Sequence, residues 1–175
     1  ELNKELRLLS AKGVIYAANV DEDAIQNDNE YVKTLKEYAQ KNNSEVMKLC
    51  SKIEEELIGL DDLEAKEMLE SLGAEESGLD AIIRRSFAKL NLISYFTAGV
   101  VEVRAWTITN GWKAPKAASV IHNDFEKGFI RAEVISYDDF IECGGENGAK
   151  EAGKMRLEGK DYIVQDGDVM HFRFN

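Results

Sequence analysis

The chain has 175 residues, enough for one large domain or two small ones. Hydrophobic residues make up 44% of it, and no apolar run approaches the roughly 18 residues that a membrane-spanning helix needs, which excludes a membrane-embedded class. The formal net charge of −11 argues against attraction of the whole chain to nucleic acid, though not against a local basic patch.

All of the net charge lies in the first part of the chain. Residues 1–80 hold 9 Lys or Arg against 20 Asp or Glu, whereas residues 81–175 hold 13 of each kind. We therefore expect two units: an acidic, mostly helical one, followed by a balanced, strand-rich one. The strongly acidic stretch 54–70 is better explained as a solvated helix face than as a binding site.

Nothing in the sequence indicates secretion. There is no signal-peptide pattern, and Cys50 and Cys143 are too few and too far apart for a disulfide framework. We therefore expect reduced thiols and a cytoplasmic location. The chain opens at Glu1 within a helical pattern over residues 2–9, so we expect it to be a piece of a longer protein.

The first half is predicted to contain α/β elements. The continuously apolar run 14–18 indicates a strand buried on both faces, and the polar loop Asn19–Glu22 follows it. Such a loop lies where open α/β sheets bind ligands. The patterns that follow predict a helix over 30–40, a strand over 44–50, and helices over 51–58, 61–72 and 78–91.

The second half is predicted to be a compact α+β domain of the ubiquitin-like β-grasp type. Pro115, the only proline, is suited to the first turn of a short helix over 115–121. Alternation over 101–104 and the run 129–135 predict strands. Residues 162–164 and 169–174 flank the turn sequence 165–168, which predicts a hairpin.

The sequence Asn19-Val20-Asp21-Glu22 is the first candidate site. P-loop GTPases place Asn-Lys-x-Asp at such a strand end, where the carboxylate accepts hydrogen bonds from guanine and the Asn braces the loops. Val20 and Glu22 replace the Lys and the Asp here, so we predict weakened guanine selectivity. Ser51-Lys52 follows the next strand, where those proteins have a second base-side loop. A capped turn is the commoner explanation of such a tetrapeptide alone.

Several kinds of catalytic site have no support. No G-x-x-x-x-G-K-S/T motif occurs in the sequence, so we predict no catalytic residue and no nucleotide hydrolysis by this chain alone. His122, Asp124 and Glu126 match no zinc spacing, so no metal site is predicted, and neither cysteine has a histidine at a telling separation. His171 is predicted to be an exposed strand residue.

Basic residues of the second half form a candidate surface for RNA or the ribosome: Lys113, Lys116, Arg131, Lys150, Lys154, Arg156 and Lys160. Ordinary loop charges balanced by neighbouring acidic residues explain the same pattern equally well. Trp106 and Trp112 are candidates for stacking on bases. We expect Trp106 to be in the core and Trp112 to be the exposed one.

At this point the sequence resembles a known family. The segments that carry the resemblance are Ala105–Ile108, Lys113–Pro115, Val120–His122, Asp124–Val134, Ala149–Arg156 and Gly159–Asp168. They are similar to the C-terminal domain of the YchF/Obg-like ATPases, translation-associated P-loop NTPases. The resemblance covers the whole chain, from the altered base-recognition motif at Asn19 to Phe174.

The resemblance implies a division of the chain and a set of site residues. Residues 91–174 would be a TGS domain, a β-grasp fold, and residues 81–90 a linking helix. Residues 1–80 would be the C-terminal remnant of an Obg-type GTPase-like domain, with the P-loop and Mg²⁺-binding segments upstream of Glu1. Asn19 and Glu22 would belong to the base-recognition motif, the Val20 backbone would contact adenine, and Ser51 and Lys52 would form the second base-side loop.

These inferences combine into one expected function. We expect the C-terminal part of a ribosome-associated P-loop ATPase or GTPase, whose parent protein uses ATP or GTP with Mg²⁺, with no nucleotide bound to this part alone. The expected partner is the ribosome or its RNA, through the TGS domain, with no membrane partner and no DNA specificity. The alternatives are a non-enzymatic RNA- or ribosome-binding module, and a TGS domain that serves as a structural brace.

Overall fold

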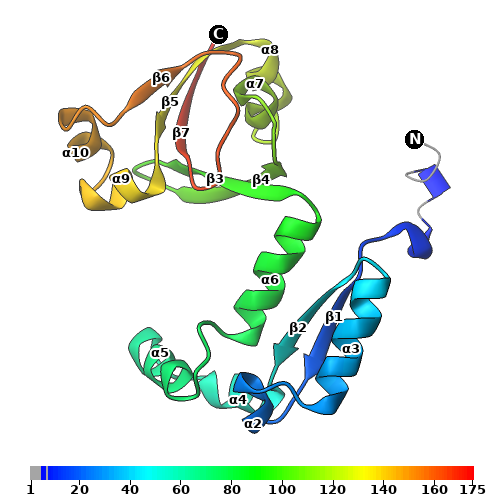
Figure 1. Ribbon diagram of the computed structural model, residues 1–175. Helices are drawn as coiled ribbons and strands as arrows, with labels where there is room; N and C mark the ends of the chain where they lie inside the picture. Colours follow the sequence, from blue (N-terminus) through cyan, green and yellow to red (C-terminus); the bar gives the residue numbers. More distant parts are fainter. Residues whose placement is uncertain (1–4, 7) are drawn as a thin grey trace. The chain divides into compact units, whose positions relative to one another are not determined.

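The computed structural model describes residues 5–6 and 8–175, which divide into two compact units, Glu1–Lys89 (unit 1) and Leu90–Asn175 (unit 2). Figure 1 shows the helices and strands of each unit. Half of the helix predicted over 2–9 lies outside the described residues, residues 5 and 6 are helical, and the short 3-10 helix η1 covers Leu9–Ala11. Within the described residues, no helix is both long and apolar enough to cross a membrane.

Unit 1 is built on two parallel strands, β1 (Ile15–Asn19) and β2 (Glu45–Leu49). Their register places Asn19 opposite Leu49, so both strands end at the same edge. The helix α3 (Glu30–Lys41) connects the strands and packs against both. The side chain of Asn29 accepts a hydrogen bond from the Val32 N–H and so begins this helix. The loops after β1 and β2 are therefore neighbours.

The remaining helices of unit 1 are α2 (Asp23–Gln26), α4 (Ser51–Leu57), α5 (Asp62–Ser71) and α6 (Gly78–Lys89). The helices predicted over 51–58, 61–72 and 78–91 are confirmed to within two residues at each end. Asp61 and Glu64 form a capping box at the start of α5. Glu54 of α4 accepts hydrogen bonds from the N–H groups of Gly78 (2.6 Å) and Leu79 (3.3 Å), where α6 begins.

The prediction that the strand at 14–18 is buried on both faces is wrong. Val14 is 41% exposed, Ala17 is exposed, and the other residues of β1 are at most half-buried. In the part of the chain that the structure describes, β1 pairs with β2 alone, so its other edge has no neighbouring strand. The buried side chains of unit 1 come instead from helices, from β2 and from Cys50 between β2 and α4: Ala24, Val32, Ala39, Met47, Cys50, Ile53 and Ala81.

Unit 2 contains a five-stranded mixed sheet in the order β4-β3-β7-β5-β6. Its strands are β3 (Leu92–Ala98), β4 (Val103–Thr109), β5 (Phe129–Ile135), β6 (Arg156–Glu158) and β7 (Val169–Phe174). The strands β3 and β7 pair in parallel, and the other neighbouring strands pair antiparallel. Its helices are α7 (Ala114–Ala118), α8 (Asn123–Lys127), α9 (Tyr137–Glu142) and α10 (Glu146–Glu151).

Helices cover the two faces of this sheet unequally. On one face, Ala117 of α7 and Phe125 of α8 pack against the main core, which includes Tyr95, Ile108 and Phe172. On the other face, a smaller cluster is formed by Ile135, Ala149 and Val169 together with the partly buried Phe140 and Met155. Figure 1 shows α7 and α8 on one side of the sheet and α9 and α10 on the other.

Several predictions for unit 2 need correction. The helix expected over 115–121 is the shorter α7, which has Pro115 in its first turn, and the strand over 129–135 is confirmed as β5. The strand predicted at 101–104 begins only at Val103, because Gly99–Glu102 forms the turn between β3 and β4. The strand β3 and the helices α8, α9 and α10 were not predicted.

The hairpin predicted across 165–168 is also wrong, because β7 pairs with β5 and β3 rather than with residues 162–164. The buried Asp168 side chain explains the difference. Its Oδ2 atom accepts hydrogen bonds from the Tyr162 hydroxyl (2.7 Å) and the Gln165 N–H (2.9 Å), which folds the segment back on itself. Of the preceding segment, Ile163 forms only an isolated bridge with Lys113.

Both tryptophans are half-buried against the main core of unit 2. The indole N–H of Trp106 donates to the Thr97 hydroxyl at 2.9 Å, and the Arg104 guanidinium lies 4.1 Å from the Trp106 ring centroid. The expectation that Trp112 is exposed is wrong, because its ring packs against the core beneath the Lys116 ammonium group. Each indole ring therefore has little exposed surface on which a nucleic-acid base could stack.

Candidate nucleotide-base site and cationic surface

The loops after β1 and β2 are joined by the Asn19 side chain. Its Oδ1 atom accepts hydrogen bonds from the backbone N–H and from the hydroxyl of Ser51, each at 3.0 Å. The N–H of Ser51 lies at the start of α4, where it has no partner within its own helix. Asn19 thus satisfies an orphan donor and holds the second loop beside the first.

A second contact joins the same two loops. The Lys52 ammonium donates to Glu22 Oε1 at 2.6 Å and lies 3.8 Å from Glu56 Oε1 one helical turn on. The hydrogen bond to Glu22 raises the pKa of the Lys52 ammonium above its usual value, so the group stays protonated. Both side chains are exposed, so the pair remains open to solvent and to a ligand.

The residues between Asn19 and Glu22 shape the first loop. The Val20 N–H donates to the Leu49 carbonyl at 2.8 Å, which continues the β1–β2 pairing by one residue. The Asp21 carboxylate accepts a hydrogen bond from the Ala24 N–H at 3.0 Å at the start of α2. Sequence analysis missed the role of Asp21, although an Asp three residues before a helical residue is a recognisable capping signal.

The structure therefore brings all five predicted nucleotide-site residues to one edge of the β1–β2 pair. The loop edge carries an exposed amide, a carboxylate and an ammonium group within a short stretch of surface. The Asn19 amide nitrogen has no hydrogen-bond partner among the described residues, so it can donate to a ligand. Such an edge can hydrogen-bond a planar heterocycle.

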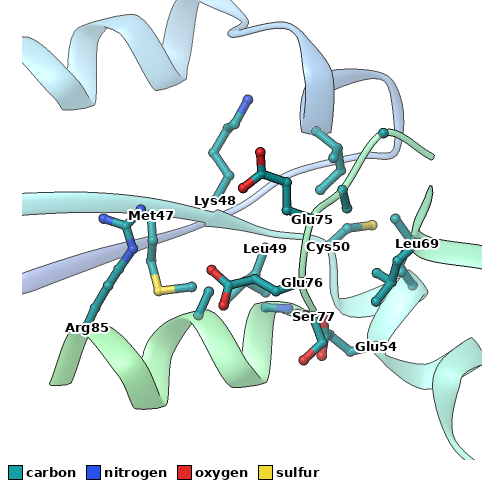
Figure 2. Close-up of a pocket in the computed structure, with 16 residues that line it drawn as sticks. Met47, Lys48, Leu49, Cys50, Glu54, Leu69, Glu75, Glu76, Ser77 and Arg85 are labelled. Carbon is teal, nitrogen blue, oxygen red and sulfur yellow. Dashed lines mark hydrogen bonds between the residues drawn. The ribbon is translucent and has the colours of Figure 1, made fainter. Parts of the chain in front are cut away.

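A separate hollow of about 310 Å³ lies elsewhere in unit 1, and Figure 2 shows the side chains that line it. They come mainly from β2, α4, α5, α6 and the segment between α5 and α6, and include Met47, Glu54, Leu69, Glu76 and Arg85. The Arg85 Nε atom is buried and lacks a hydrogen-bond partner, whereas the Glu54 carboxylate already caps α6. None of the five predicted nucleotide-site residues lines this hollow.

The predicted cationic surface of unit 2 is largely neutralised by neighbouring carboxylates. Four of its seven members lie in ion pairs: Lys113 with Asp161 (2.7 Å), Lys116 with Glu126 (3.8 Å), Lys154 with Asp139 (3.0 Å), and Arg156 with Asp168 (3.5 Å) and Glu158 (3.9 Å). Within the described residues, Arg131, Lys150 and Lys160 have no acidic partner closer than 4.0 Å. The seven residues are therefore not equivalent.

The two histidines take structural or surface positions. The His122 Nδ1 atom accepts a hydrogen bond from the Asp124 N–H at 3.2 Å at the start of α8, and His171 is exposed on β7. Across the part of the chain that is described, no three His, Cys, Asp or Glu side chains are grouped so as to hold a metal ion.

Comparisons with known proteins find close relatives. The family model YchF-GTPase_C, described as a protein of unknown function (DUF933), matches residues 92–175. The ribosome-binding ATPase YchF of Haemophilus influenzae is 61% identical over 172 residues, which cover 98% of this chain and 47% of that protein. The Obg-like ATPase 1 of Rattus norvegicus is 46% identical over 179 residues, covering 99% of this chain and 44% of that protein.

A solved structure is similar to this chain over most of its length. The YchF GTPase of Schizosaccharomyces pombe superposes with a TM-score of 0.79 at 38% identity, covering 97% of this chain and 45% of that one. The chain spans about half the length of the curated relatives that it matches.

Proposed function

Because the chain belongs to the YchF family, of which it matches the C-terminal part, we propose that it is the C-terminal portion of a ribosome-associated P-loop ATPase or GTPase of the cytoplasm. Unit 1 supplies the base-side loops of the nucleotide site, and unit 2 docks the protein on the ribosome. The phosphate- and Mg²⁺-binding segments belong to the rest of the parent protein. The observation that carries the proposal is the joining of Asn19 to Ser51 and of Glu22 to Lys52.

This geometry favours adenine over guanine. The free amide N–H group of Asn19 suits the N7 acceptor that both purines share, so Asn19 does not distinguish them. Guanine recognition needs a carboxylate that accepts two adjacent donors of the base. The Glu22 carboxylate already accepts from Lys52 at 2.6 Å, so guanine would have to displace this contact. Adenine presents only one hydrogen-bond donor on the corresponding edge, so its binding depends less on a free Glu22 carboxylate than the binding of guanine does.

We further propose that unit 2 is a TGS domain with the β-grasp fold. The strand order β4-β3-β7-β5-β6, with the first and last strands parallel at its centre, supports this assignment. The packing of α7 and α8 across one face of the sheet supports it as well. The printed names of the relatives, which include ribosome binding, favour unit 2 as a docking module.

Two measurements test the proposal. In the parent protein, V20K combined with E22D should restore guanine geometry and raise the affinity for GTP relative to ATP. S44A, in the loop before β2, is a matched control. An unchanged ratio of GTP to ATP affinity would remove Val20 and Glu22 from the base site.

The second measurement is co-sedimentation of this chain with ribosomes, without nucleotide, across a salt series. Salt-sensitive pelleting is expected, since phosphate contacts weaken as ionic strength rises. Absence of pelleting from folded protein would refute the docking role of unit 2 and leave it as a brace. Pelleting together with no ATP hydrolysis by this chain is the expected combination. Turnover that N19A abolishes would contradict the assignment of phosphate chemistry to the rest of the parent protein.

A further inference from the structure

The helix α5 contributes no buried residue to unit 1. Its residues Ala65 and Leu69 are half-buried, and Leu63 is 74% exposed. An exposed apolar side chain also lies on either side of it in the sequence, Ile58 after α4 and Leu79 in α6. Since a helix of this length depends on packing for its stability, α5 presents an apolar surface that the described residues leave mostly uncovered.

A hollow of about 710 Å³, the α5–α6 hollow, is bounded by one face of α5. The α5 residues that line it are Asp62, Ala65, Lys66, Leu69 and Glu70, whose spacing places them on one side of the helix. The opposite wall is the segment 73–77 together with Asp80 of α6. Leu69 and the segment 73–77 also line the hollow of Figure 2, so the two hollows adjoin.

The polar lining of the α5–α6 hollow is strongly acidic. Its charged members are the carboxylates of Asp62, Glu70, Glu75, Glu76 and Asp80 and a single cation, Lys66. Glu76 accepts a hydrogen bond from Arg84 Nε at 3.1 Å, and this contact lowers the pKa of the Glu76 carboxyl, so the group stays ionised. Within the described residues, Asp62 and Glu75 have no basic partner within 4.0 Å. The hollow therefore keeps a negative charge that the chain itself does not balance.

The same hollow lies in the most acidic part of the sequence. Residues 54–80 hold 11 Asp or Glu and one Lys, a net of −10 out of the −11 of the whole chain. Five of these carboxylates line one hollow, together with the apolar side chains of Ala65, Leu69 and Ala74. Charge complementarity therefore requires a positively charged occupant, and the apolar lining requires one that also carries apolar groups.

Lysine and arginine side chains meet both requirements, because their apolar stems pack on apolar surface while their charged ends stay at its rim. A bare metal ion fits less well, since no three His, Cys, Asp or Glu side chains of the described part are grouped so as to hold one.

We propose that the α5–α6 hollow is a docking site for a Lys- and Arg-rich segment of a protein partner. The cations of that segment pair with Asp62, Glu75 and Asp80, and its apolar stems pack on Leu69. The inference goes beyond the proposed function, because it concerns a protein partner of unit 1 and needs neither the nucleotide nor the ribosome. Sequence analysis explained the stretch 54–70 as a solvated helix face, since only the fold brings Asp62 and Glu75 to one hollow.

The test measures the binding of fluorescently labelled peptides to the full chain by anisotropy across a salt series. The probes are a helical peptide of Lys and Leu and an oligolysine of the same net charge, with spermine as the competitor. D62N/E75Q removes two carboxylates of the hollow that have no basic partner among the described residues. The matched control E55Q/E67Q removes two exposed carboxylates of α4 and α5 that do not line the hollow. Equal far-UV dichroism should confirm that each variant is folded.

We expect the wild type to bind the Lys/Leu peptide more tightly than oligolysine, in a salt-sensitive manner. D62N/E75Q should weaken this binding about fivefold, because two exposed ion pairs are lost. E55Q/E67Q should change the affinity by less than about twofold.

Three results would overturn the inference. Equal weakening by the two double variants would show that only the net charge of unit 1 attracts the peptide. Equal affinity for the two peptides, or displacement of the Lys/Leu peptide by spermine at the same concentration of charge, would identify the occupant as a simple polycation. Binding of neither peptide would remove the docking site altogether. None of these results bears on the nucleotide and ribosome roles, since the variants leave Asn19, Ser51 and unit 2 unchanged.

Discussion

The Oδ1 atom of Asn19 accepts hydrogen bonds from both the N–H and the hydroxyl of Ser51, 32 residues away, at 3.0 Å each. This one side chain ties the end of β1 to the start of α4. The N19A variant should therefore lower the free energy of unfolding of unit 1 by about 1–2 kcal/mol, since it leaves a helix N-terminal donor without its partner.

Urea unfolding followed by far-UV circular dichroism measures the effect of N19A. Both tryptophans lie in unit 2, so a change in unit 1 appears in the dichroism and leaves the tryptophan transition in place. N27A, at an exposed asparagine after α2, is the control and should be neutral. Equal stability of N19A and N27A would show that the contact with Ser51 contributes nothing.

Glu54 is expected to stabilise α6 from a distance in sequence. Its carboxylate bonds the N–H groups of Gly78 and Leu79, at the positive end of a 12-residue helix. The E54A variant should lose about 1 kcal/mol of unit 1 stability and part of the helical dichroism. E55A, which changes the exposed next residue of the same helix, should have little effect. A loss as large in E55A as in E54A would point to helix propensity rather than to capping.

Asp168 is expected to be the most sensitive polar residue of unit 2. It is 2% exposed and accepts hydrogen bonds from Tyr162 and Gln165, with the Arg156 guanidinium 3.5 Å away. The D168A variant leaves these donors unpaired and should cost about 3 kcal/mol, measured by urea unfolding with tryptophan fluorescence. D138A, at an exposed position of α9, is the comparison. A loss below about 1 kcal/mol in D168A would mean that water replaces the carboxylate.

The Glu133–Arg173 pair predicts a pH dependence with a definite sign. Arg173 lowers the pKa of the Glu133 carboxyl below its ordinary value of 4.5, so the folded state binds this proton more weakly than the unfolded state does. The stabilisation of the folded state by the Glu133–Arg173 pair is therefore complete above pH 4.5. It is lost as the pH falls through the lowered pKa of the Glu133 carboxyl. The stability difference between wild type and E133Q in unit 2 should be largest near neutral pH and shrink below 4.5.

Tryptophan-monitored unfolding at several pH values measures this difference. E151Q, at an exposed carboxylate of α10, is the comparison variant. A pH-independent difference for E133Q would show that the ion pair does not perturb the carboxyl.

Sequence patterns predicted elements whose signal is local. The run of residues 129–135 predicts the strand β5, and apolar spacing predicts the helices of unit 1. The strand β3 was missed because its apolar residues follow α6 almost without a break and continue the apolar pattern of that helix. The hairpin at 165–168 was wrong because the partners of β7 lie far away in sequence.

The same distinction holds for the candidate sites. The proximity of Asn19 and Ser51 followed from a general rule, that parallel strands end at one edge. The Glu22–Lys52 pair and the position of Arg173 beside Arg131 depend on side-chain reach and strand register, which no local pattern encodes. Balancing of the basic residues by neighbouring carboxylates was one of the two explanations that the sequence left open. The individual pairs, Lys113 with Asp161 and Lys154 with Asp139, are seen only in the folded chain.

The central position of β7 has a consequence for how unit 2 is made. Phe96 of β3 pairs with Val169 of β7, so the middle of the sheet joins residues 73 positions apart. During synthesis, the β3–β4 hairpin and α7 are complete long before the strand that must lie beside them exists. Their apolar faces stay uncovered until β7 has been made. Closing the loop between Phe96 and Val169 carries an entropic cost that slows folding. The sheet of unit 2 therefore receives its central strand last.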